Sequence, residues 1–175
     1  MRLFIAINFP DVVKATVAKI RDTIKESALR GNFSLIENLH LTLVFLGECD
    51  VRQTKAVQSV LNDTQFSTFT LEFEKIGYFK RDSGNIWWIG LKENKSLSCL
   101  QADLTERLQQ KGFVLEDRKY TPHVTIAREV RMSAEFVKPE VGKVCFGVTS
   151  IELMKSENIK GKLVYTQIHS KNVII

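Results

Sequence analysis

The sequence contains few residues of the kinds that build cross-linked or membrane-embedded proteins. Among 175 residues there are only three cysteines, Cys49, Cys99 and Cys145. Their odd number and wide spacing argue against a disulfide framework and against a zinc site, so a reducing compartment fits best. No apolar run approaches the ~20 residues that a membrane helix needs, and the N-terminal run LFIAI is too short for a signal peptide. We therefore expect a cytoplasmic protein without membrane contact.

The chain also lacks linker-like segments, because no stretch is rich in proline or serine. Hydrophobic residues make up 44% and charged residues 26% of the sequence, which is ordinary globular composition. This length is enough for one domain and too short for two, so we expect a single domain over residues 1–175 and a monomer. The net charge of +5 mildly favours an anionic partner without identifying one.

The hydrophobic pattern predicts an α+β fold with mostly antiparallel strands. The first helix should begin at Asp11 and carry an apolar face formed by Val13, Val17, Ile20 and Ile24. The last of the three predicted helices should end near Gly112. The remaining predicted elements are strands at 2–7, 38–48, 66–78, 85–91 and 122–127, a helix around 56–61, and two strands, VCFGVTSIELMKS and KLVYTQIHS, around the turn ENIKG.

Two short segments share one pattern of histidine, apolar residue, threonine, apolar residue. They are HLTL, which begins at His40, and HVTI, which begins at His123. Because side chains alternate between the faces of a strand, each segment presents its histidine and threonine on one face and its apolar residues on the other. If the two strands belong to similar half-structures, Thr42 and Thr125 would join both histidines in one groove.

Such a groove suits phosphodiester chemistry. One imidazole can be neutral and accept a proton while the other is charged and donates one, since the unperturbed pKa is ~6.5. Threonine hydroxyls can stabilise the charge that builds on phosphate oxygens. Either motif alone is common by chance, whereas two copies in strands with matching apolar partners indicate function.

At these residues the sequence resembles the 2H phosphoesterases, and within them the LigT-like RNA 2',3'-cyclic phosphodiesterases, also called 2'-5' RNA ligases. The resemblance covers nearly the whole chain and includes RLFIAINFP, LHLTLVFLGE, IWWIGL, YTPHVTIAR and IELMKSE. It implies a bilobal fold with two lobes related by a pseudo-twofold axis, each an antiparallel sheet with outer helices, around a central groove. It also implies opening of a terminal 2',3'-cyclic phosphate on RNA, such as a tRNA fragment, to a 2'-phosphate without a metal or cofactor.

Carried over by position, the resemblance gives each motif residue a role. His40 would protonate the departing 3' oxygen, His123 would activate water, and the two threonines would hold the phosphate. The same pair could use an RNA 5'-hydroxyl in place of water and so form a 2'-5' linkage. An arginine at the position of Arg128 resembles one that approaches the substrate phosphate, although strict strand alternation puts residue 128 on the opposite face from His123.

Aromatic and basic residues near the motifs are further candidates for RNA contact. One of Trp87 and Trp88 should point outward, where a base could stack on it, and Tyr120 is a similar candidate. Arg118, Lys119 and Arg131 flank the second motif and could contact RNA phosphates or form a solvated charged face. His169 lacks a threonine two residues later, so we interpret it as structural.

Three functions remain open at this point. The first is the RNA cyclic phosphodiesterase with 2'-5' ligase capability. The second uses the same groove for a small cyclic phosphate derived from a nucleotide or from ADP-ribose. The third is a non-catalytic RNA-binding module. A metallohydrolase is weaker, because the two histidines have no nearby residues at ligand spacing.

Overall fold

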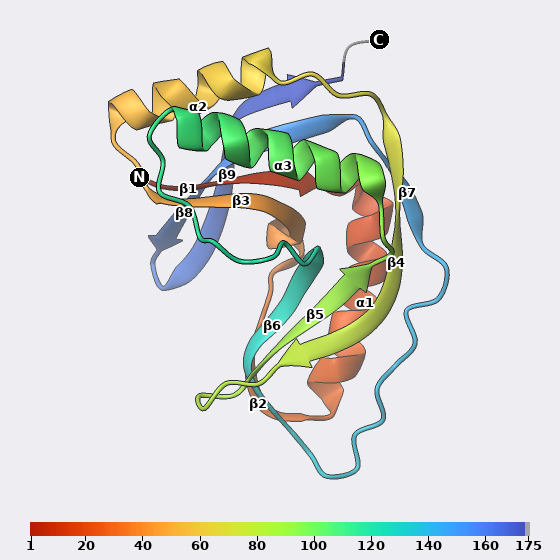
Figure 1. Ribbon diagram of the computed structural model, residues 1–175. Helices are drawn as coiled ribbons and strands as arrows, with labels where there is room; N and C mark the ends of the chain where they lie inside the picture. Colours follow the sequence, from red (N-terminus) through yellow and green to blue (C-terminus); the bar gives the residue numbers. More distant parts are fainter. Residues whose placement is uncertain (174–175) are drawn as a thin grey trace.

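The computed structural model describes residues 1–173 and contains two antiparallel sheets, each covered by helices on one face (Figure 1). The strand order is β3-β1-β8-β9 in the first sheet and β2-β6-β5-β4-β7 in the second. The strands are β1 (Arg2–Asn8), β2 (Ala28–Phe33), β3 (His40–Glu48), β4 (Phe69–Phe79), β5 (Asn85–Leu91), β6 (His123–Met132), β7 (Cys145–Val148), β8 (Ser150–Ile159) and β9 (Lys162–Asn172). The predicted α+β class and the two-lobed antiparallel architecture are confirmed.

The three helices bury the apolar faces that their sequences predict. They are α1 (Asp11–Glu26), α2 (Val51–Asp63) and α3 (Lys95–Gln110). Helix α1 contacts β2 and β6 of the second sheet, whereas α2 and α3 lie side by side against the first sheet (Figure 1). Helix α2 starts with a capping box in which Asp50 and Gln53 satisfy each other's backbone N–H groups. None of the helices in the described residues is long and apolar enough to cross a membrane.

The core lies between each sheet and its helices. Alternate residues of the central strands point into it, for example Ile5 and Ile7 of β1 and Ile89 of β5, all of which are essentially inaccessible to solvent. The opposite face of each sheet is therefore left to line the space between the lobes. Strands β3 and β6, one from each sheet, approach each other at this space.

Three details differ from the sequence prediction. Residues 28–33 form a strand, β2, where no element was predicted, because alternation is hidden by Gly31 and by polar residues on an edge strand. The predicted segment VCFGVTSIELMKS is two strands in different sheets, since β7 pairs with β4 and β8 pairs with β1. Strand β8 also runs to Ile159, so the turn narrows to Lys160 and Gly161, both at positive φ.

Candidate functional site

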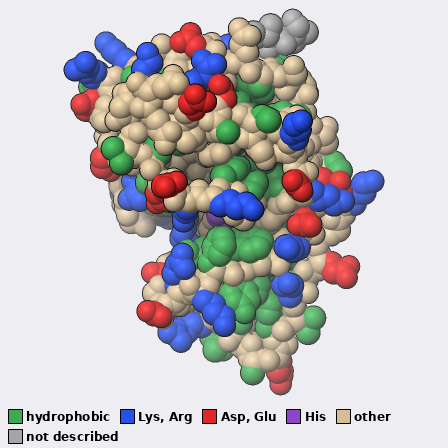
Figure 2. Space-filling view, in the orientation of Figure 1, with side chains coloured by type: hydrophobic (Ala, Val, Ile, Leu, Met, Phe, Trp, Pro, Cys, Tyr) green, Lys and Arg blue, Asp and Glu red, His purple; other side chains and the backbone are tan. Residues whose placement is uncertain are grey.

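A groove of about 1580 Å³ lies between the two sheets. His40 and Thr42 of β3 line it together with His123, Thr125 and Arg128 of β6. The structure therefore brings together the five residues to which the sequence analysis gives a role at the phosphate. In Figure 2 the groove is a hollow between the lobes, with apolar side chains over β5 and β6 and Lys and Arg side chains around them.

Both histidines are oriented by the same local hydrogen bond. Nδ1 of His40 lies 2.7 Å from the carbonyl oxygen of Asn38, and Nδ1 of His123 lies 2.7 Å from that of Thr121. A carbonyl can only accept, so Nδ1 carries the proton and each Nε2 is left for the groove. Nε2 of His40 is 2.9 Å from the hydroxyl of Thr42, which can donate to it. Each imidazole is thus held in the tautomer that suits proton transfer at Nε2.

A β-bulge lies at the last residue of each motif, and the second bulge explains the position of Arg128. In the β1–β3 pair, Ile5 and Ala6 lie opposite Val44 and Thr42, so Leu43 is an extra residue. Both Leu43 and Val44 point into the core, and the next residue returns to the groove face.

Strand β6 has the same irregularity one step after its own threonine. Trp87 and Trp88 lie opposite Ala127 and Thr125, so Ile126 is the extra residue. Ile126 and Ala127 are both fully buried, and Arg128 therefore shares the face of the second motif and lines the groove. Strict alternation placed Arg128 on the other face, and the bulge is the physical reason that this placement is wrong.

Phe45 is a groove residue that sequence reasoning missed. It follows the bulge of β3 as Arg128 follows that of β6, and it lies five residues after its histidine. Phe45 is 44% exposed and lines the groove, and its ring centroid lies 5.1 Å from the guanidinium carbon of Arg2. The equal spacing after the two histidines is the signal that could have identified it.

The two imidazoles are buried to different extents, and burial lowers the pKa of each. The ring of His40 contacts the rings of Phe4 and Tyr165 at centroid distances of 4.8 and 5.2 Å. Desolvation there lowers the pKa of His40 to about 4, while the Asn38 carbonyl opposes the shift and the charges of Lys14, Arg128 and His123 add to it. His40 is therefore neutral at pH 7 in the free protein.

The second imidazole is less enclosed. The ring of His123 lies 5.3 Å from that of Phe79 and 6.3 Å from that of Trp88. Desolvation again lowers the pKa of His123, the Thr121 carbonyl opposes this, and the charge of Arg128 adds to it. The cation of Arg128 thus helps to lower the pKa of both imidazoles.

The aromatic candidates are placed differently from one another. Trp87 is the inward residue and packs in the core, whereas Trp88 is half-buried near His123 on the sheet face that carries Thr125, but it is not among the groove-lining residues. The indole of Trp88 lies over Gly77 of β4, where a Cβ atom would come within 2.3 Å of the ring. Tyr120 is not among the groove-lining residues, and its hydroxyl donates to the carbonyl oxygen of Thr42 at 3.0 Å. The hydroxyl of Tyr120 therefore bonds the backbone of the edge strand β3 within the first motif.

The flanking basic residues lie outside the lining of the groove. Arg118 pairs with Glu116 at 2.7 Å, and Arg131 donates to the carbonyl oxygen of Asp82 at 3.2 Å. Lys119 lies in the irregular segment before β6. The basic residues that do line the groove, besides Arg128, are Arg2, Lys25, Arg81, Lys155 and Lys162, against Glu48, Glu129 and Glu157. The groove is therefore a cationic surface suited to phosphate groups.

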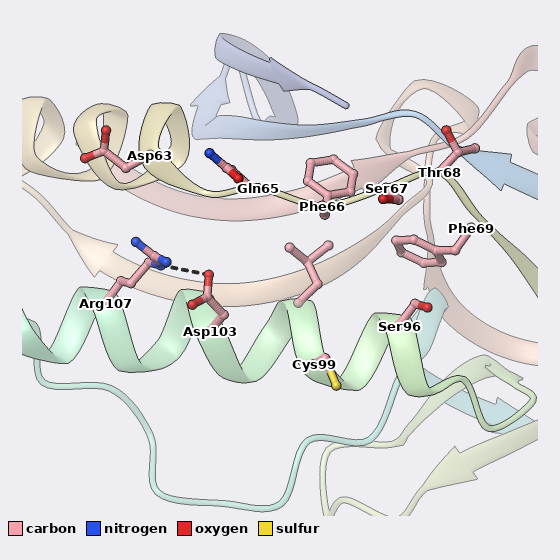
Figure 3. A pocket seen from close by; sticks show the side chains of 11 residues that line it. Asp63, Gln65, Phe66, Ser67, Thr68, Phe69, Ser96, Cys99, Asp103 and Arg107 are labelled. Carbon is pink, nitrogen blue, oxygen red and sulfur yellow. Dashed lines mark hydrogen bonds and ion pairs between the residues drawn. The ribbon is translucent and has the colours of Figure 1, made fainter. Parts of the chain in front are cut away.

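A second, smaller cavity of about 550 Å³ lies on the helical side of the first lobe, between the end of α2 and α3 (Figure 3). Its cation, Arg107, is already paired with Asp103 at 2.8 Å. None of the site residues predicted from the sequence lines it. The interlobe groove is therefore the candidate active site.

Comparison with known proteins shows the family of the chain. The family model of the 2'-5' RNA ligase superfamily matches residues 9–160. The chain belongs to the 2'-5' RNA ligase superfamily. It is 32% identical to an RNA 2',3'-cyclic phosphodiesterase of Archaeoglobus fulgidus over 138 residues, which cover 77% of this chain and 76% of that protein. It is 34% identical to an RNA 2',3'-cyclic phosphodiesterase of Thermotoga maritima over 131 residues, covering 73% and 70%.

Solved structures of the superfamily share the architecture. The crystal structure of E. coli LigT complexed with 3'-AMP superposes with a TM-score of 0.87 and 26% sequence identity. The match covers 98% of this chain and 97% of that chain. The fold described above is thus shared with this relative over nearly the whole of both chains.

Proposed function

We propose that this protein is a metal-independent RNA 2',3'-cyclic phosphodiesterase that opens a terminal cyclic phosphate to a 2'-phosphate. The observation that carries the proposal is the convergence of His40 and His123, each with Nδ1 bonded to a backbone carbonyl, in one cationic groove. The names of the relatives from Archaeoglobus and Thermotoga support the same substrate class. The RNA ends would include tRNA fragments, and the protein would act as a cytoplasmic monomer.

The reaction needs one base, one acid and charge stabilisation. Water attacks phosphorus as the base removes its proton, the bond from phosphorus to the 3' oxygen breaks, and the acid protonates that oxygen. Thr42, Thr125 and Arg128 would bind the non-bridging oxygens as negative charge builds on them. A strained five-membered phosphate already holds its leaving oxygen in place, so these few groups suffice.

The resemblance makes His40 the acid and His123 the base. In the free protein, however, burial keeps His40 neutral at pH 7. The acid role therefore requires that the bound phosphate, by neutralising Arg128 and adding its own charge, raise the pKa of His40. The reverse assignment uses His40 as the neutral base from the start. The pH profiles of single variants distinguish the two.

Phe45 would bind the terminal base. Its exposed ring lies in the groove on the wall that carries His40, whereas Arg128 occupies the matching position on the other wall. A base stacked on an aromatic ring contributes roughly 1–3 kcal/mol without strong sequence preference. This arrangement suits the nucleotide that bears the cyclic phosphate, and it accepts RNA ends of different sequence.

A substrate-length series in the presence of a chelator tests the proposal. We expect kcat/KM to rise from a 2',3'-cyclic mononucleotide to an oligonucleotide with the same end, because the upstream phosphates meet Lys and Arg side chains of the groove. This gain should shrink as salt is added. Equal rates across the series would favour the small cyclic phosphate as substrate. RNA binding without turnover would favour a non-catalytic module, and loss of turnover on chelation would remove the two-histidine mechanism.

Ligation would use the same groups in the same roles, with a different nucleophile. The 2'-5' ligase capability implied by the superfamily requires an RNA 5'-hydroxyl where water otherwise attacks. Incubation of a cyclic-phosphate oligonucleotide with a 5'-hydroxyl oligonucleotide tests this. The expected product is a 2'-5' linkage that resists nucleases specific for 3'-5' bonds.

A further inference from the structure

Tyr165 of β9 lies in the groove beside the first histidine. Its ring packs edge-on against His40, with centroids 5.2 Å apart and an interplanar angle of 80°. It also packs edge-on against Phe4 at 5.0 Å, and it lines the groove. The sequence motifs do not point to this residue, because β9 is distant in the chain and its own strand carries no histidine-threonine pattern.

Curling of the first sheet brings Tyr165 to this place. Strands β3 and β9 are the two edges of the sheet, with β1 and β8 between them. Asn38 links the edges, because its carbonyl accepts from Nδ1 of His40 while its side-chain amide donates to the carbonyl oxygen of Leu163 at 2.7 Å. Asn38 thus holds the imidazole of His40 and also bonds β9 at Leu163, two positions before Tyr165.

The hydroxyl of Tyr165 is available to a ligand. Among the hydrogen bonds of residues 1–173 none uses it, in contrast to the hydroxyl of Tyr120, which is bonded to Thr42. Burial raises the pKa of Tyr165, against the opposing charges of Arg128 and Arg2, so the phenol is protonated at neutral pH and acts as a donor. The charge of Arg128 acts to lower the pKa of Tyr165 and of both histidines, although Arg128 belongs to the other lobe.

We propose that Tyr165 is a further catalytic residue, whose hydroxyl donates a hydrogen bond to a non-bridging oxygen of the cyclic phosphate from the wall opposite Arg128. This inference rests on the proposed function and deepens it. Negative charge grows on the non-bridging oxygens as water adds to phosphorus, so a donor placed there stabilises the transition state more than the ground state. Tyr165 keeps its proton throughout, and the two imidazoles carry out the proton transfers.

Tyr165→Phe is the decisive variant, since it removes the hydroxyl and keeps the ring against His40. We expect kcat on a cyclic-phosphate oligonucleotide to fall at least ~10-fold, with a smaller change in KM. Tyr78→Phe is the matched control. Tyr78 is 43% exposed, packs on Trp87 and does not line the groove, so its loss of a hydroxyl should leave the kinetics unchanged.

Sulfur substitution supplies a readout that a structural role would not change. We expect the wild type to discriminate between the two phosphorothioate diastereomers of the cyclic phosphate, because sulfur accepts hydrogen bonds poorly. Tyr165→Phe should lose at least ~10-fold of this discrimination, since the variant has no hydroxyl to favour oxygen at that position.

Three results would overturn the inference. They are wild-type kinetics in Tyr165→Phe, a rise in KM alone, and a lower kcat with the diastereomer preference intact. Each would mean that the Tyr165 hydroxyl does not stabilise a non-bridging oxygen in the transition state. Turnover by the wild type separates this failure from failure of the proposed function, because an inactive wild type refutes the function itself. Circular dichroism of each variant verifies folding.

Discussion

Arg128 and His123 share one face of β6 although five positions separate them. The bulge at Ile126 shifts the alternation by one residue, so the guanidinium is directed into the groove and lowers the pKa of the imidazole. The matching bulge in β3 gives Phe45 the same relation to His40. One wall of the groove thus presents a cation and the other an aromatic ring at equivalent positions.

The first prediction concerns Arg128. Arg128→Gln should lower kcat/KM by about 10²-fold, because a positioned donor to the developing phosphate charge is lost. It should also raise the pKa of both histidines, since the cation lowers them in the free protein. Steady-state kinetics and NMR titration of the imidazoles measure the two effects.

Arg131→Gln is the control for this prediction. Arg131 lies on the same strand but bonds the carbonyl of Asp82 and does not line the groove. Its kinetics should stay within about threefold of the wild type. A loss as large in Arg131→Gln as in Arg128→Gln would attribute both effects to general surface charge.

The second prediction is that both motif histidines are required. His40→Ala and His123→Ala should each lower the rate at least ~10²-fold, the usual scale for loss of one general acid or base. His169→Ala is the matched control, because His169 does not line the groove and its Nε2 bonds the side chain of Asn62. Near-normal turnover by either folded motif variant would refute the two-histidine mechanism.

The sequence predicted the strands of the site well and their irregularities poorly. The alternation of Leu41 and Leu43 with polar residues was enough to place His40 and Thr42 on one face, as the structure has them. Bulges leave no such pattern, since an extra apolar residue in a strand resembles an ordinary core residue. The position of Arg128 therefore required the pairing register of β5 and β6.

Long-range packing accounts for the remaining differences. Tyr120 resembled a substrate-contacting aromatic, but its hydroxyl satisfies the carbonyl of Thr42, a partner distant in the sequence. Tyr165 gave no local signal, because its contact with His40 depends on the curl of a whole sheet. Strand β7 was merged with β8, since only pairing with β4 separates them.

The third prediction concerns Gly77 and the indole beside His123. A Cβ atom at Gly77 would lie 2.3 Å from Trp88, so Gly77→Ala should destabilise the fold by ~1–3 kcal/mol through overpacking. Gly147→Ala is the control, since no heavy atom lies within 4 Å of the new Cβ atom and the φ angle there is ordinary. Urea unfolding followed by tryptophan fluorescence measures both. Equal midpoints would show that the Trp88 ring moves without cost.

The fourth prediction links the burial of His40 to stability. Its pKa is about 4 in the folded protein and near the ordinary 6.5 in the unfolded chain. As the pH falls from about 6.5 to 4 the unfolded state therefore binds a proton first, so the free energy of unfolding decreases, by up to the order of 3 kcal/mol. Urea unfolding between pH 4 and 7.5 measures this loss.

His40→Gln supplies the comparison for this measurement. The variant should show a shallower loss of stability on acidification, because its side chain does not titrate. Burial raises the pKa of Glu152, which contributes with the opposite sign, but that contribution is common to both proteins. Parallel stability curves for the wild type and the variant would contradict the burial of a neutral His40.

The fifth prediction assigns the acid and the base. With one imidazole neutral and the other charged, kcat/KM should be bell-shaped, with its maximum displaced to the acid side of pH 6.5 because both pKa values are lowered. If His123 is the base, His123→Ala flattens the acidic limb and His40→Ala the basic limb.

Binding of the 2'-phosphate product tests the same assignment without turnover. If His40 is the acid, the bound anion must raise its pKa by at least about one unit, which NMR titration with and without product measures. An unchanged pKa together with loss of the acidic limb in His40→Ala would make His40 the base and His123 the acid. A flat wild-type profile from about pH 5 to 9 would exclude acid-base catalysis by this pair. The two measurements assign the roles independently, because one follows the imidazole itself and the other follows the reaction.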